Sequence, residues 1–268
     1  MRIVEINMTI NETKFKTLLV EHQDHILHIS LNRPEKKNAI NPAMTNELLF
    51  VLDYADKTDS VRVLDLSAQG DVFCAGGDLR NMSGEENDDI PNMDGNLVDV
   101  IKNLRNLNKP VVCRIEGNVY AGALLLVCNA THAYALNDVT FTAPEIKRGI
   151  WPFMVMAGLF RVMPKRVGLD FIMRGNAIDA NQALTHGLIN QHFVKEDFQI
   201  EVDKIISELS SMPPNAMKKG LSAFHKQEFD DFEDAMNFLE SEINDSLKSD
   251  EAIEGITAFL EKRKPNWK

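Results

Sequence analysis

Alternating apolar and polar positions near the start of the chain predict a β-hairpin, and a helix follows it. The segments FKTLLVE (15–21) and HILHISLN (25–32) alternate on either side of His22-Gln23-Asp24, which is typical of two paired strands. Asn41-Pro42 predicts a helix start, because Asn is a good N-cap and Pro fits the first helical turn. Residues 1–14 show no such pattern and are expected to form a loose N-terminal arm.

The order strand, glycine-rich turn, helix occurs twice in the middle of the chain. A buried strand predicted at 61–67 runs into FCAGGDLRNM (73–82), and the strand VVCRIEG (111–117) runs into GNVYAGALLLVCN (117–129). This repetition predicts an α/β protein of stacked ββα units, and not a nucleotide-binding sheet. The acidic segment 84–95 between the two repeats is expected to be a mobile loop or a plain surface insertion.

From about Met154 the apolar periodicity is helical. Asp179 is expected to cap the helix ANQALTHG, and a short strand is expected at QHFV (191–194). Pro213-Pro214 separates this part from two or three amphipathic helices that run to the end. The expected organisation is a core over residues 15–205 and a C-terminal helical region over 206–268, which forms a subdomain or an oligomer contact.

Composition narrows the classes of partner. The formal net charge of −11 argues against general binding of nucleic acid, which requires a basic face. The apolar runs are too short to cross a bilayer, so no membrane insertion is expected. Three cysteines in a chain of 268 residues show no metal-ligand spacing, so we expect no metal site and a reducing, cytoplasmic location.

The two glycine-rich segments are the strongest chemical signal. Each brings small residues, and therefore approachable backbone N–H groups, ahead of a predicted helix. Two such donors from separate segments suit an oxygen that becomes negatively charged, as a thioester oxygen does during enolate formation. No Ser–His–Asp arrangement accompanies them. His132 and His186 are expected to be hydrogen-bonded within a strand and at a helix end, and Asp138 is expected in a turn.

Six segments in order carry a resemblance to a known family: NRPEKKNAIN, FCAGGDLRNM, KPVVCRIEGNVYAG, FTAPEIKRG, IDANQALTHGLIN and EGITAFLEKRKPNWK. Together they cover the chain from about Phe15 to Lys268, and they resemble the enoyl-CoA hydratase/isomerase (crotonase) family. The resemblance implies a crotonase-like spiral of ββα units closed by C-terminal helices that pack into homotrimers, often paired as hexamers. It also implies an acyl-CoA thioester as substrate, with no cofactor beyond the CoA of the substrate.

The resemblance assigns roles to individual residues. The backbone N–H groups of Gly77 and Gly122 are expected to hold the thioester oxygen. Independently of the resemblance, Trp151, Phe153 and Met154 are candidates to line an acyl pocket, with plain core packing as the alternative. Asp78 is expected to cap the next helix beside the substrate. The other residues expected near the substrate or its CoA are Lys36, Lys37, Ala39 and Ala75, with Phe259 and Lys262 reaching the nucleotide bound by a neighbouring subunit.

The reaction depends on two positions. Family hydratases use two glutamates around a water molecule; the later one is matched by Glu145, but the earlier position is Leu125. Leucine can neither accept a proton nor align a water molecule. The sequence therefore favours a 3,2-enoyl-CoA isomerase, in which Glu145 alone moves a proton. A hydratase of an unusual or branched acyl-CoA and a non-catalytic acyl-CoA-binding homologue remain open as alternatives.

Overall fold

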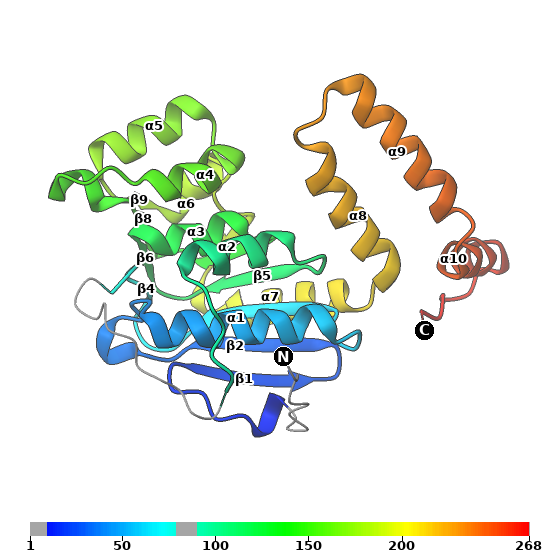
Figure 1. Cartoon of the computed structure of the whole chain (residues 1–268), viewed down its shortest axis with the longest axis horizontal. Helices are drawn as coiled ribbons and strands as arrows, with labels where there is room; N and C mark the ends of the chain where they lie inside the picture. The colour runs from blue at the N-terminus through cyan, green and yellow to red at the C-terminus, as the bar shows by residue number, and fades with distance from the viewer. Residues whose placement is uncertain (1–9, 79–89, 268) are drawn as a thin grey trace.

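A six-stranded sheet forms the base of the core in a computed structural model that describes residues 10–78 and 90–267 (Figure 1). Its antiparallel β1–β2 hairpin continues into parallel pairings across β3, β5, β7 and β10. In that spatial order, the strands are β1 (Leu18–Gln23), β2 (Ile26–Leu31), β3 (Val63–Ala68), β5 (Val111–Ile115), β7 (His132–Leu136) and β10 (Gln191–Phe193).

A second, smaller sheet is formed mainly by short strands that come directly after three strands of the first sheet. β3, β5 and β7 each lead into a short strand of a second sheet, whose order is β4 (Val72–Cys74), β6 (Asn118–Tyr120), β8 (Thr140–Thr142) and β9 (Ile178–Asp179). β4, β6 and β8 are parallel, and β9 is antiparallel to β8. The repeat of two strands and a helix confirms the predicted stacking of ββα units.

Helices cover both sheets, and several begin where the sequence predicts. Asn41 caps α1 (Pro42–Lys57) by accepting a hydrogen bond from the Met44 N–H at 2.9 Å, and Asp179 caps α6 (Ala180–Thr185). The other helices around the sheets are η1 (Ile10–Glu12), η2 (Pro34–Lys36), α2 (Leu97–Asn106), η3 (Ala121–Ala123), α3 (Leu124–Asn129), η4 (Pro144–Arg148), α4 (Phe153–Val162), α5 (Lys165–Arg174) and α7 (Lys195–Ser210).

Three local expectations need revision or restriction. The hairpin turns at Asp24-His25, one step later than predicted, because Asp24 adopts the left-handed conformation that Asp tolerates (φ 52°). Within the expected loose arm, Ile10 is buried in η1, while residues 1–9 lie outside the described residues. Residues 84–89 of the expected mobile loop also lie outside them, and the part that is described is tied to α1 by Asn46, which donates to the Pro91 carbonyl at 3.2 Å.

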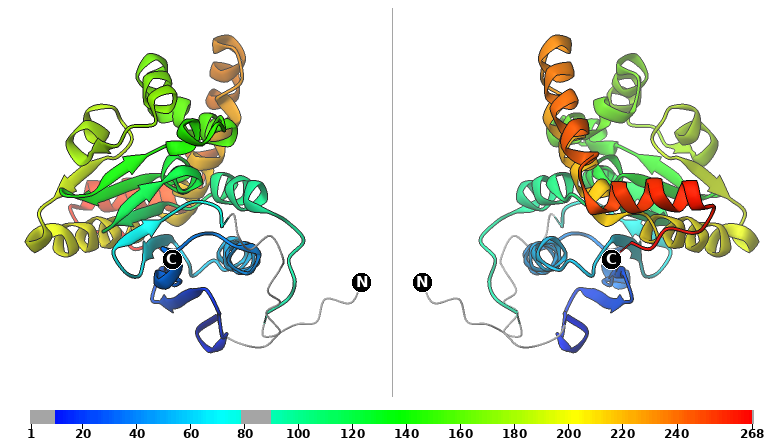
Figure 2. Two further views of the ribbon diagram at one scale, coloured as in Figure 1. Left: turned by 90° about the vertical axis from the view of Figure 1, so that its left-hand side faces the viewer. Right: turned by 90° about the vertical axis from the view of Figure 1, so that its right-hand side faces the viewer.

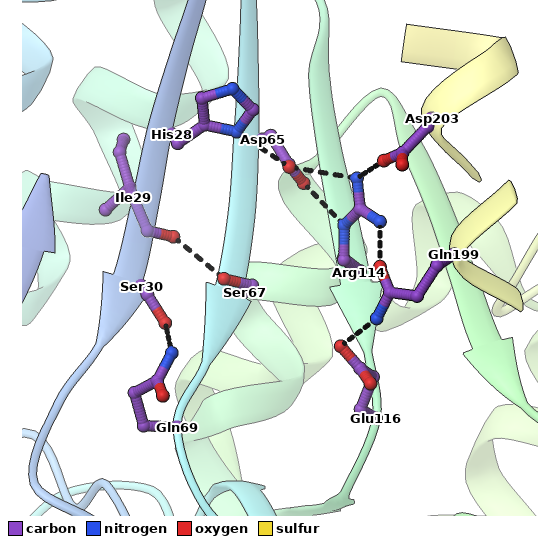
Figure 3. Close-up of polar contacts among 10 residues, drawn as sticks. All are labelled: His28, Ile29, Ser30, Asp65, Ser67, Gln69, Arg114, Glu116, Gln199 and Asp203. Atoms are coloured by element: carbon purple, nitrogen blue, oxygen red, sulfur yellow. Dashed lines mark hydrogen bonds and ion pairs between the residues drawn. The ribbon is translucent and has the colours of Figure 1, made fainter. Parts of the chain in front are cut away.

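A buried polar network fastens α7 to the six-stranded sheet (Figure 3). Asp65 on β3 accepts from Arg114 Nε on β5 at 3.2 Å and lies 3.1 Å from His28 Nδ1 on β2. Arg114 also donates to Asp203 on α7 at 2.6 Å and to Gln199. Burial alone would raise the pKa of Asp65, but the His28 hydrogen bond and the Arg114 charge hold it below its ordinary value. The pair is therefore charged at neutral pH.

The last three helices leave the core. α8 (Pro214–Gln227), α9 (Phe232–Ser246) and α10 (Asp250–Glu261) lie to one side of the two sheets in Figure 1, and α9 also projects beyond the core in Figure 2. The boundary expected at residue 206 falls inside α7, whose Ile206 is buried in the core. The part that projects therefore begins with α8. Among the described residues, no helix combines the length and apolar character needed to cross a membrane.

Candidate active site

The three residues expected to act in catalysis follow three adjacent parallel strands. Gly77 comes shortly after β4, Gly122 after β6 and Glu145 after β8. The register pairs Cys74 with Val119 and Tyr120 with Thr142, so the three strands end at the same edge of the small sheet (Figure 1). Ligand sites of parallel sheets lie at the carboxyl ends of their strands. The turns that carry the three residues therefore follow the same edge of the small sheet, although the residues are spread along the chain.

The two glycine-rich turns touch each other at this edge. A Cβ added to Gly76 would lie 2.9 Å from the Ala121 Cβ and 3.0 Å from the Gly122 nitrogen, and a Cβ on Gly122 would lie 3.8 Å from the Gly77 nitrogen. Gly76 and Ala121, which precede the two expected donors, both have left-handed backbones (φ 87° and 53°). A non-glycine residue held in this region is a strained feature that clusters at functional sites.

The N–H groups of Gly77 and Gly122 are available to a ligand. Among the described residues, neither donates to a protein acceptor, whereas the adjacent N–H groups of Ala75 and Asp78 donate to Lys37 O at 3.0 Å and Ile40 O at 2.8 Å. Gly77 is exposed and Gly122 lies in the first turn of η3, so both N–H groups can be reached from outside the fold. Two such donors side by side form the arrangement that stabilises an oxyanion.

A buried ion pair links the first glycine-rich turn to the loop of residues 33–40. Arg33 donates to Asp78 Oδ2 at 3.2 Å and to the Ala39 carbonyl at 2.5 Å, and both charged side chains are largely buried. Local sequence does not predict this contact, because Arg33 and Asp78 lie 45 positions apart. Asp78 was expected to cap a helix; the structure shows it paired with Arg33, and the residues after it lie outside those described.

Glu145 has the environment of an acid–base group. It lies in η4, half-buried, and its Oε2 is buried without a hydrogen-bond partner among the described residues. Burial raises the pKa of this carboxyl, against smaller opposing effects of its own backbone N–H and of Arg148. A carboxylate that is poorly solvated and unpaired is a strong proton acceptor.

Leu125 faces an apolar groove between α2, α3 and α4. Leu125 is buried, and the groove beside it is lined by Val98, Ile101, Met154 and Ala157. Gly158 lets α4 approach α3 closely, because a Cβ there would lie 2.8 Å from the Cys128 Cβ. The groove begins close to Gly122, since a Cβ on Gly122 would be 3.8 Å from Leu97 Cδ2, and Leu97 precedes the groove residue Val98 at the start of α2.

Only part of the expected acyl pocket lies at this groove. Met154 lines it, but Phe153 is 70% exposed, and Trp151 is absent from the described groove lining and donates to Met156 Sδ at 3.1 Å instead. Apolar periodicity does not distinguish a residue that faces a groove from one that packs in the core.

The residues expected at the CoA end divide into two groups. Lys36 and Lys37 are exposed on the loop that pairs with the first glycine turn, so they lie on its open side. Phe259 and Lys262 are on or beside α10, far from the small sheet (Figure 1). Within one chain, the structure does not bring these two residues to Gly77 and Gly122.

The remaining titratable candidates are structural. His132 contacts Thr131 Oγ1 at 2.9 Å, and burial lowers its pKa. His186 ends α6, as predicted. In the described part of the chain, no group of three or more His, Cys, Asp or Glu residues is placed to hold a metal ion.

Known proteins are similar to this chain in architecture and in sequence. The family described as enoyl-CoA hydratase/isomerase matches residues 21–268. Human enoyl-CoA hydratase domain-containing protein 3, mitochondrial, is 31% identical over 246 residues, covering 91% of this chain and 81% of that protein. Its crystal structure has a TM-score of 0.87 at 28% identity and covers 94% of this chain and 100% of that one. The trans-2-decenoyl-[acyl-carrier-protein] isomerase of Streptococcus mutans is 29% identical over 262 residues, covering 94% of this chain and 98% of that protein.

The match extends over nearly the whole chain and includes the strands whose ends carry Gly77, Gly122 and Glu145. The resemblance in the six sequence segments and the spiral of ββα units agree with it. This chain belongs to the enoyl-CoA hydratase/isomerase family.

Proposed function

We propose that this protein is an enoyl-CoA isomerase that shifts a 3-enoyl double bond to the 2-position. The Gly77 and Gly122 N–H groups receive the thioester oxygen. Glu145 takes a proton from C2 and returns it at C4, while the oxygen held by the two N–H groups carries the dienolate charge. The observation that supports this proposal is the buried carboxylate oxygen of Glu145 that has no hydrogen-bond partner among the described residues, together with leucine at position 125, where the second carboxylate was expected.

Efficient hydration needs a second group to align water, and the buried, apolar Leu125 does not provide one. The human relative is named for an enoyl-CoA hydratase domain, and the Streptococcus mutans relative is named an isomerase. Hydration of an unusual acyl-CoA is therefore the second candidate. A role in binding without catalysis is the third.

One experiment separates these functions. The protein is incubated in D₂O with trans-3-hexenoyl-CoA and, separately, with crotonyl-CoA, and both mixtures are followed by NMR and mass spectrometry. Formation of the 2-enoyl isomer, with no addition of water across the double bond, supports the isomerase. A 3-hydroxyacyl product would overturn it in favour of the hydratase, and binding without any conversion would favour the binding role.

The proposed unit of function is a homotrimer, or a hexamer of two trimers. Large apolar side chains are exposed along the projecting helices, including Phe232, Phe259 and Leu260. An unpaired chain would leave these side chains in water. In such an assembly, Phe259 and Lys262 would approach the CoA nucleotide bound by a neighbour. No cofactor other than the CoA of the substrate is proposed.

The cytoplasmic location stays a prediction. Cys74, Cys113 and Cys128 are all buried and unpaired, which fits a reducing compartment. The vertebrate relatives carry "mitochondrial" in their names.

A further inference from the structure

The apolar groove beside Leu125 has a charged far end. Val98, Ile101, Lys102 and Arg105 lie along one face of α2, and Met154, Ala157, Gly158 and Arg161 lie along one face of α4. Val98 follows Leu97, which adjoins Gly122, whereas Arg105 and Arg161 both contact Glu228. The two arginines therefore meet at the end of the groove that is distant from the oxyanion hole.

These two arginines share a single carboxylate. Arg105 donates to one oxygen of Glu228, and Arg161 Nε donates to the other at 3.1 Å. Their side chains are only 23% and 33% exposed, and the side chain of Glu228 is 26% exposed. The group of three thus has an excess of one positive charge in a partly buried place. Each charged side chain that the structure places along this groove is basic.

His225, which lies in α8 close to Glu228, does not change this charge balance. The Nδ1 of His225 is buried and has no hydrogen-bond partner among the described residues. Burial, together with the charge of Arg105, lowers the pKa of His225, so the ring stays neutral at physiological pH. The far end of the groove therefore offers two guanidinium groups at the end of an apolar wall.

We propose that this groove selects acyl-CoA substrates whose acyl chain ends in a carboxylate, which Arg105 and Arg161 bind. The proposal rests on the proposed acyl-CoA function and names its substrate class. The methylene groups contact Val98, Ile101 and Met154, and the terminal carboxylate forms charge-assisted hydrogen bonds to the guanidinium groups. A methyl-ended chain of the same length would instead place its apolar end against partly buried charges.

The length of the groove indicates the length of the chain. Val98 and Arg105 are seven residues apart on α2, so they are separated by roughly 10 Å along the helix axis. An extended chain advances roughly 1.2 Å per bond, so about eight bonds cover this distance. An octanedioyl chain, with eight bonds from the thioester carbon to a terminal carboxylate oxygen, matches this span.

The test compares two saturated ligands of equal carbon number, octanedioyl-CoA and octanoyl-CoA, by isothermal titration calorimetry. Neither ligand can be isomerised, so binding is measured without turnover. The wild-type protein is expected to bind octanedioyl-CoA about tenfold more tightly, as a hydrogen bond to a charged group allows. Arg105→Met and Arg161→Met are each expected to remove most of this preference and to change octanoyl-CoA affinity by less than about threefold.

Two further variants control the result. Glu228→Gln removes the competing carboxylate and is expected to increase the affinity for octanedioyl-CoA. Arg174→Met removes an exposed arginine of α5 that pairs with Asp170 at 3.2 Å, and it is expected to change neither ligand's affinity. Circular dichroism melting checks the folding of each variant. If an arginine variant does not fold, the wild-type preference and the Glu228→Gln variant decide the question.

The outcomes separate this inference from the proposed function. Equal or tighter binding of octanoyl-CoA by the wild type overturns the carboxylate selection and leaves the acyl-CoA function intact. If the arginine variants lose affinity for both ligands equally, the arginines have a purely structural role, and the selection is also overturned. Failure of both ligands to bind the wild type overturns the acyl-CoA function and the selection together.

Discussion

Glu145 and Leu125, the two positions on which the proposed reaction depends, have opposite properties. Glu145 is half-buried and keeps one carboxylate oxygen without a partner, which disfavours its charged form. Leu125 is buried and apolar, at the position where the proposed function would need a second carboxylate for hydration. At the scale of single side chains, the site is therefore suited to moving a proton and poorly suited to activating a water molecule.

Glu145→Gln is expected to lower kcat for 3-hexenoyl-CoA isomerisation by about 10³-fold, because the amide cannot accept the C2 proton. The affinity for hexanoyl-CoA should be nearly unchanged, since the two N–H groups and the groove remain. Turnover is followed by NMR and affinity by calorimetry. Glu196→Gln, which changes an exposed glutamate of α7 in the same way, is the matched control. Full activity in Glu145→Gln would exclude this residue as the base.

The raised pKa of Glu145 has a second consequence, for the pH dependence of rate and stability. Because burial raises it above the ordinary value of 4.5, kcat/KM should fall on the acid side at a higher pH than an exposed glutamate would give. The folded state also binds this proton more tightly than the unfolded state does, so the buried charge destabilises the fold at neutral and higher pH.

Glu145→Gln is consequently expected to have a higher Tm than the wild type at pH 8. The difference should shrink as the pH falls through the raised pKa, because the wild-type carboxyl then becomes neutral as well. Scanning calorimetry from pH 5 to pH 8 measures both proteins. A lower Tm for the variant across this whole range would contradict an unfavourable buried charge.

At the scale of elements, the site is assembled where three short strands end together. β4, β6 and β8 are only three residues long each, and the turns after them carry the reactive groups. The first turn is held by the loop of residues 33–40, whose Ile40 N–H donates to the Gly76 carbonyl at 2.8 Å. The position of the Gly77 N–H therefore depends on backbone packing.

Two neighbouring glycines of the first turn should respond differently to alanine. Gly76→Ala places a Cβ 2.9 Å from the Ala121 Cβ and 3.2 Å from the Tyr120 carbonyl, on a left-handed backbone. We expect it to displace the oxyanion hole and to lower kcat/KM by about 10²-fold or more. Gly77→Ala meets nothing within 4 Å and should stay within about threefold of wild type, because its backbone donor is kept. Steady-state kinetics of both variants test this, and similar effects of the two would refute it.

The elements show which features can be predicted from sequence and which cannot. Caps such as Asn41 and Asp179 act within three residues, so local sequence is enough to predict them. The match to a family gave Gly77, Gly122 and Glu145. In contrast, Arg33 meets Asp78 across 45 positions, and Arg105 meets Glu228 across 123. Such pairs depend on how distant elements pack, which periodicity does not contain.

At the scale of the whole molecule, the chain has one part that carries the site and one that projects from it. The strand ends, the groove and the loop of residues 33–40 all precede α8. α8, α9 and α10 expose a row of large apolar side chains, among them Phe232 at 82% and Met236 at 51%. We expect this row to be covered by other copies of the chain.

Phe232→Asp combined with Met236→Asp is expected to convert the assembly into smaller species, because it places charges in an apolar contact. Light scattering after size-exclusion chromatography measures the mass. Leu19→Asp is the matched control, since Leu19 is a similarly exposed apolar residue on β1, away from these helices. A wild-type protein that is already monomeric would contradict the proposed trimer.

The contact between Gly76 and Ala121 also restricts how this sequence can change over time. The Ala121 methyl lies where a side chain at position 76 would have to go. The two positions are therefore coupled, although they belong to different turns. Loss of the methyl group at 121 alone would not make room at 76, because the Gly122 nitrogen, the Tyr120 carbonyl and the left-handed backbone also oppose a side chain there, so a larger residue at 76 requires both turns to change together.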